Sequence, residues 1–134
     1  MDIANTSFFG ILRERLSQLS ERQRLIAENI ANASTPGYQP RDLDASAFQR
    51  MLDTQSGGVR LARTNAGHMT PGGGPGAAQI VTRPDSETTL DGNSVVLEEQ
   101  TVRATETRMQ YETALALYQK GLQLMRMASR PPGR

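Results

Sequence analysis

An apolar heptad that stops at a Thr-Pro-Gly turn is the feature that most constrains what this chain can fold into. Its members are spaced by alternating steps of three and four: Phe9, Leu12, Leu16, Leu19, Gln23, Ile26 and Ile30. Only Gln23 is polar. Pro36 disfavours the helical region for Thr35 before it, and Gly37 readily takes a positive φ. The sequence therefore predicts a helix over residues 6–33, about 40 Å long at 1.5 Å per residue, that ends in a fixed turn.

A second long helix is expected over residues 94–130. Its apolar seam comprises Leu97, Ala104, Tyr111, Leu115, Tyr118, Leu122 and Met125. Glu98 and Glu99 fall in its first turn and Arg126 in its last, where each sign of charge is favoured by the helix dipole. Further apolar residues flank the seam, so the stripe is wider than a single partner helix requires.

The segment between the helices, residues 34–93, has a different character. Glycine and proline punctuate it, most densely at residues 71–76, and short apolar pieces at 59–61 and 79–81 could pair as small strands. A short amphipathic turn is expected from Arg41 to Leu52, and low order from about Gln55 to Gly92. The fold class that follows is mainly α, one domain over residues 1–134. Two antiparallel helices form a coiled-coil-like core, because the long connection can return the chain.

Composition narrows the function. The net charge of +1 argues against a nucleic-acid partner held by bulk electrostatics, and no run approaches the roughly 20 apolar residues of a membrane-inserted helix. Cysteine is absent, which excludes a disulfide or thiolate site. His68 is the only histidine and lacks nearby metal-ligand partners. We therefore expect no catalytic, metal or cofactor site, and an enzyme using His68 or Asp42 is the weaker alternative.

Two parts of the sequence resemble a known family. Asn29-Ile30-Ala31-Asn32, a spacer and Thr35-Pro36-Gly37-Tyr38 resemble the signature that follows the first helix of bacterial flagellar rod and hook proteins. The stretch from Asp91-Gly92-Asn93 to Met125-Arg126-Met127-Ala128 resembles the second helix of the short proximal rod members, except that Val96 stands where an aspartate is expected. The turn alone does not separate these members from siblings of FlgC type.

The resemblance implies a structural subunit of the basal-body rod that transmits motor torque and is not an enzyme. Implied partners are further copies in a helical assembly, FlgC-like and FlgF-like rod proteins, a FliE-type adaptor, the MS-ring protein and the flagellar type III export apparatus. Export without a cleaved signal peptide would carry the chain into a rod that spans the periplasm. Asn29 and Asn32 would either contact neighbouring subunits or, for Asn32, cap the first helix.

The two apolar seams are the expected assembly surface. Its residues are Leu12, Leu16, Leu19, Ile26, Ile30, Leu97, Tyr111, Leu115, Tyr118, Leu122 and Met125. A cytoplasmic coiled-coil adaptor or chaperone would also explain two heptads, but it would not need the Thr-Pro-Gly-Tyr turn or the glycine-rich middle.

Overall fold

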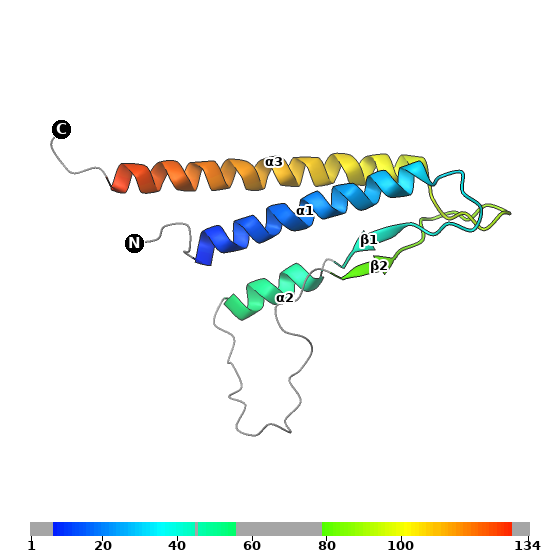
Figure 1. Cartoon of the computed structure of the whole chain (residues 1–134), viewed down its shortest axis with the longest axis horizontal. Helices are drawn as coiled ribbons and strands as arrows, with labels where there is room; N and C mark the ends of the chain where they lie inside the picture. Colours follow the sequence, from blue (N-terminus) through cyan, green and yellow to red (C-terminus); the bar gives the residue numbers. More distant parts are fainter. Residues whose placement is uncertain (1–6, 45, 56–78, 130–134) are drawn as a thin grey trace, which may run out of the picture.

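The computed structural model describes residues 7–44, 46–55 and 79–129. Its elements, in order, are α1 (Ser7–Ala31), β1 (Arg41–Leu43), α2 (Ser46–Gln55), β2 (Ile80–Thr82) and α3 (Leu97–Ala128). The helices α1 and α3 lie side by side and antiparallel, so the start of α1 and the end of α3 share one end of the molecule (Figure 1). The expectation of a mainly α chain with a long helix near each end is confirmed.

The helix α1 is the centre of the fold because it is covered on two sides. α3 packs against one side, while β1, β2 and α2 lie on the other (Figure 1). Leu12, Leu19 and Ile26 of the predicted seam are buried, and Leu25, outside that seam, has no exposed surface at all. A heptad of apolar residues covers only the helix face that meets one neighbouring element. Because α1 packs between α3 on one side and the ribbon with α2 on the other, it requires a wider buried face.

The face of α3 that meets α1 carries small and polar residues. Gln100, Thr107 and Ala114 are its buried positions, one heptad apart. Gly121 continues this line, and a Cβ there would lie 3.1 Å from the ring of Phe9. Small side chains allow the two helices to approach closely, so the larger apolar residues of α3 flank the contact and do not fill it.

The chain before α3 differs from the expectation in two ways. α3 begins at Leu97, three residues after the expected Ser94, because Asn93 and Ser94 are buried in a turn described below. The expectation of low order is wrong for residues 79–92, where β2 pairs antiparallel with β1, Leu43 opposite Ile80. Backbone hydrogen bonds from Arg83 to Pro40 and from Asp44 to Gln79, both 2.8 Å, extend the ribbon.

The short amphipathic turn expected from Arg41 to Leu52 is resolved into two elements. β1 takes its first residues and α2 the rest, and the Asp44 carboxylate accepts the Ser46 backbone N–H at 2.9 Å where α2 begins. Several expectations lie outside the described residues, namely those for His68, for the apolar piece at 59–61 and for the glycine-rich run at 71–76. Within the described ranges, no helix combines the length and the apolar character that crossing a bilayer demands.

Candidate functional site

The turn that ends α1 is stabilised by hydrogen bonds from its own side chains, those of Asn32 and Thr35. Nδ2 of Asn32 donates to the Glu28 carbonyl at 2.8 Å, and Oδ1 of Asn32 accepts the Thr35 hydroxyl at 3.1 Å. The Tyr38 N–H then donates to the Thr35 carbonyl at 3.2 Å. Gly37 has φ +70°, the left-handed value that a type II turn needs at this position. The predicted positive φ of Gly37 is confirmed.

A second loop, residues 89–94, closes over this turn. Nδ2 of Asn93 donates to the carbonyls of Asn32 at 3.0 Å and Thr35 at 2.7 Å. The Gly37 N–H donates to the Asp91 carbonyl at 2.9 Å, and the Ser94 N–H donates to the Tyr38 carbonyl at 3.0 Å. We call residues 32–38 and 89–94 together the turn clasp. It fixes the end of α1 to the chain entering α3.

Two features restrict the backbone conformation of the loop at residues 89–94. Gly92 has φ +84°, and a Cβ on it would stand 3.4 Å from the Gly37 Cα. The Thr89 hydroxyl and the Asn93 backbone N–H donate to the Asp91 carboxylate and hold the pKa of Asp91 below its usual value. The sequence interpretation used Asp91-Gly92-Asn93 for its family resemblance and Asp91-Gly92 as punctuation of the middle segment, without placing it against the turn that ends α1. The Asp-Gly pair, which is typical of tight turns, was the signal for this structure.

Asn29 connects the clasp to both helices from a position that is only 1% exposed. Its Nδ2 donates to the Arg41 carbonyl at 2.8 Å and to Oε1 of Gln100 at 3.1 Å. Its Oδ1 accepts the Arg41 N–H at 2.9 Å and the Tyr38 hydroxyl at 3.2 Å. The expectation that Asn29 contacts neighbouring subunits is wrong, because its amide is buried and satisfied within the chain. For Asn32, the hydrogen bonds favour the capping alternative.

Asp85 continues this polar chain and supplies the helix cap that Val96 lacks. Val96 stands at the N-cap of α3 without a side-chain hydrogen bond, but its N–H donates to the Asp85 carboxylate at 2.8 Å. The same carboxylate accepts Nε2 of Gln100 at 2.8 Å and Nη1 of Arg103 at 2.5 Å. Tyr38, Asn29, Gln100, Asp85 and Arg103 thus form one polar chain, whose three middle members are buried and whose two ends are half-buried. A carboxylate eleven residues before Val96 caps the helix, which local sequence patterns do not reveal.

Asp42, the acidic residue of the weaker alternative, is a partner of Arg22. The guanidinium of Arg22 donates to both carboxylate oxygens, at 2.8 and 2.9 Å, and Asp42 is 2% exposed. This bidentate geometry fixes β1 against α1 and leaves the carboxylate without a free face for acid or base chemistry.

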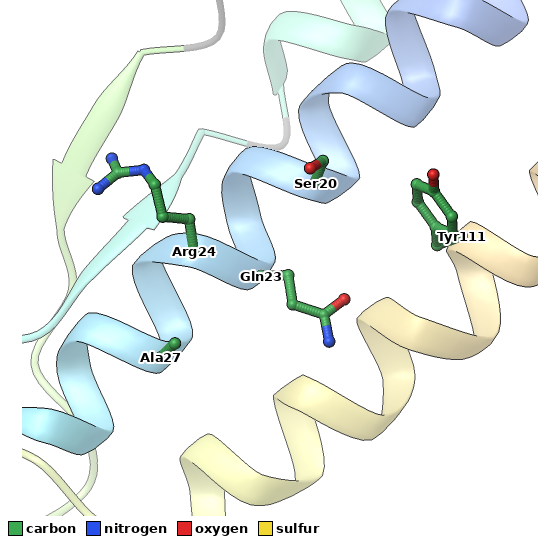
Figure 2. Close-up of a pocket in the computed structure, with 5 residues that line it drawn as sticks. All are labelled: Ser20, Gln23, Arg24, Ala27 and Tyr111. Carbon is green, nitrogen blue, oxygen red and sulfur yellow. The ribbon is translucent and has the colours of Figure 1, made fainter.

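Two shallow grooves flank the contact between α1 and α3. The first, about 390 Å³, is lined by Ser20, Gln23, Arg24, Ala27 and Tyr111. Figure 2 shows Gln23 and Tyr111 projecting between the helices, whereas Arg24 points away from α3, where it pairs with Glu21 at 2.6 Å. The second groove, about 410 Å³, is lined by Leu12, Arg15, Met109, Gln110, Thr113, Ala114 and Leu117.

The remaining predicted residues are distributed over the clasp and the seams. Ala31, Thr35 and Pro36 of the turn are exposed, and Asn32 and Tyr38 are half-buried. The half-buried seam residues are Leu16, Tyr111, Leu115, Tyr118, Leu122 and Met125. Ile30 and Leu97 are exposed, at 39% and 48%. The structure thus leaves much of the predicted seam uncovered within one chain, and its role in assembly stays a prediction.

Comparisons with known proteins agree with this geometry. The family described as flagella basal body rod protein matches residues 10–39, which contain most of α1 and the whole first half of the clasp. The flagellar basal body rod protein FlgB of Cereibacter sphaeroides (strain ATCC 17029 / ATH 2.4.9) is 34% identical over 108 residues, covering 81% of this chain and 82% of the relative. FlgB of Salmonella typhimurium is 32% identical over 110 residues, covering 78% and 80%.

FlgB of Escherichia coli (strain K12) is 34% identical over 110 residues, covering 78% of this chain and 79% of the relative. Identity of this size over about four fifths of both chains reaches well beyond the 30 residues that match the family. The enzyme alternative is therefore wrong, because the relatives are structural components. The chain belongs to the flagellar basal body rod protein family and is similar to its FlgB members.

Proposed function

We propose that this chain is a structural subunit of the proximal part of the flagellar rod, where it assembles helically and transmits motor torque toward the hook. The observation that carries the proposal is the similarity to FlgB proteins over four fifths of the chain. The turn clasp supports it, because a rigid connection between two long helices suits a part that must resist twisting.

We also propose that the predicted seam residues complete their burial in the assembly. Within one chain, α1 and α3 meet along Gln100, Thr107, Ala114 and Gly121, so most large apolar residues of α3 lie beside the contact. Such flanking residues would pack against helices of neighbouring subunits in coiled-coil fashion. Contacts of this kind that do not close on themselves generate a helical tube.

The partners follow from the same proposal. They are other copies of this chain, FlgC-like and FlgF-like rod proteins, a FliE-type adaptor and the MS-ring protein. The chain would reach the rod through the flagellar type III export apparatus without a cleaved signal peptide and would stand in the periplasmic part of the basal body. A FlgC-type position in the rod is the second candidate within the family.

Replacement of one seam residue tests the proposal. Leu115 is half-buried on α3, and Leu115→Asp places a carboxylate where a neighbouring helix would pack, at a cost of several kcal/mol. In a strain that lacks the native gene, we expect the variant to be exported but absent from isolated basal bodies, and swimming to be lost. Gln119→Asp, at an exposed position on the same helix, should swim.

Two results would contradict the proposed rod function or the proposed role of Leu115. Recovery of the unchanged protein in the cytoplasm, with none in isolated basal bodies, would favour the adaptor or chaperone alternative. Normal incorporation of Leu115→Asp would show that this side of α3 is free in the rod.

A further inference from the structure

A second apolar stripe runs along α3 beside the contact with α1, and two of its members, Met109 and Leu117, line the second groove. The stripe consists of five residues, each between 50% and 62% exposed: Val102, Met109, Leu117, Leu124 and Met127. At 100° per residue they fall on one narrow face of the helix, whereas Gln100, Thr107 and Ala114 point toward α1. We call these five residues the outer stripe. Five large apolar side chains in line on one helix mark a surface that is covered in the working protein.

The charges beside the outer stripe are separated along the helix. At 100° per residue, Glu106 lies in line with the first half of the stripe and Lys120 lies in line with the second half. The two arginines of the first half, Arg103 and Arg108, are paired with Glu99 and Glu112, and residues 113–129 contain no acidic residue. Glu106, Lys120 and Arg126 have no ion-pair partner among the described residues. The first half of the stripe is therefore complementary in charge to the second half.

This charge complementarity indicates which partner covers the outer stripe. We propose that the outer stripe binds the outer stripe of a second copy of this chain, with the two α3 helices parallel and displaced by fifteen residues. Val102 of one copy then lies against Leu117 of the next, and Met109 lies against Leu124. The displacement is about 22 Å at 1.5 Å per residue, and it places Glu106 next to Lys120. The inference rests on the proposed function, since a polar rod requires its copies to point the same way.

We choose the parallel over the antiparallel direction of the two α3 helices because of the part of the outer stripe that each arrangement leaves uncovered. An antiparallel pair would also join the acidic half to the basic half, with Val102 opposite Leu124, but both halves would be used within one closed dimer. In the displaced parallel arrangement, the second half of one copy and the first half of another remain free. That arrangement can add further copies, as a helical assembly requires.

Cysteine crosslinking distinguishes the two directions, because the chain has no native cysteine. The double variant Val102→Cys with Leu117→Cys should give a ladder of disulfide-linked copies when basal bodies are oxidised with copper phenanthroline. The two sites lie about 22 Å apart in one helix, so they cannot pair within a chain. The double variant Val102→Cys with Leu124→Cys is the matched control for the antiparallel register, and it should give little crosslinking.

Charge exchange provides the second readout. Glu106→Lys should lower the yield of the ladder about two- to fivefold, as expected for an exposed ion pair. Lys120→Glu should do the same, and the two changes together should restore the yield. A dimer from the Leu124 control without a ladder would overturn the parallel arrangement. Absence of every copy-to-copy crosslink in basal bodies that contain the chain would overturn the inference and leave the rod function intact.

Discussion

Asn29→Asp should unfold the clasp end of the molecule although it changes a single atom type. The Asn29 amide donates two hydrogen bonds, of 2.8 and 3.1 Å, to the oxygens of Arg41 and Gln100. A carboxylate cannot donate them, and it would face both oxygens at a site that is 1% exposed. Two lost hydrogen bonds amount to about 1 kcal/mol each, and a buried unpaired charge adds several more. We expect the free energy of unfolding to fall by about 3 kcal/mol or more.

The assay is urea unfolding followed by circular dichroism at 222 nm, with trimethylamine N-oxide added to strengthen the folded state. Gln23→Glu is the matched control: it makes the same amide-to-acid change on an exposed residue of α1 and should keep the native midpoint. Burial raises the folded-state pKa of the new carboxyl above its unfolded value near 3.9. The part of the loss that comes from the charge is therefore absent below about pH 4 and grows as the pH rises through the folded-state pKa. The part that comes from hydrogen bonding remains at low pH, because a protonated carboxyl can donate only one of the two hydrogen bonds. Equal midpoints for the two variants at pH 7 would refute the reasoning.

Two further substitutions test single features of the same contacts. Gly37→Val should lower the free energy of unfolding, because a β-branched residue at φ +70° is strained by more than about 1 to 2 kcal/mol. Gly10→Ala within α1 should raise the free energy of unfolding by up to about 1 kcal/mol. Thr107→Val should leave the protein as stable or stabilise it by up to about 1 kcal/mol, since the Thr107 hydroxyl is buried with no hydrogen-bond partner among the described residues. Thermal unfolding of each variant is the measurement, and a marked loss in Thr107→Val would show that this hydroxyl has a partner.

The parts of the fold that depend on local sequence were predictable. The end of α1 follows from the restrictions that Pro36 and Gly37 place on their own backbone, and the structure places the last residue of α1 at Ala31, two residues before the expected end. The buried residues Leu12, Leu19 and Ile26 follow from the heptad, because one face of a helix must meet its neighbour whatever that neighbour is.

The contacts between distant segments were not predictable. Gln100 and Thr107 are polar, so a search for apolar seams passed over them, although both have no exposed surface. Gln100 is tolerated there because Asn29 and Asp85, 71 and 15 residues away, satisfy its amide. Leu25 was missed for a related reason: it lies outside the heptad, and a periodic pattern in α1 does not show that β1 and α2 also pack against this helix.

The placement of these contacts has a consequence for assembly. The buried hydrogen bonds gather at one end, where Asn29, Gln100 and Asp85 meet. Toward the other end, α3 meets α1 through the small residues Ala114 and Gly121, the edge-to-face pair of Phe9 with Tyr118, and an exposed hydrogen bond from Arg15 to Gln110. Hydrogen bonds at the clasp fix register and direction but add only about 1 kcal/mol each, and small residues bury little apolar area. The pair of helices is therefore well defined in geometry, and most of its buried apolar side chains come from α1. The large apolar residues of α3 remain exposed or half-buried in the single chain, and we propose that neighbouring subunits cover them.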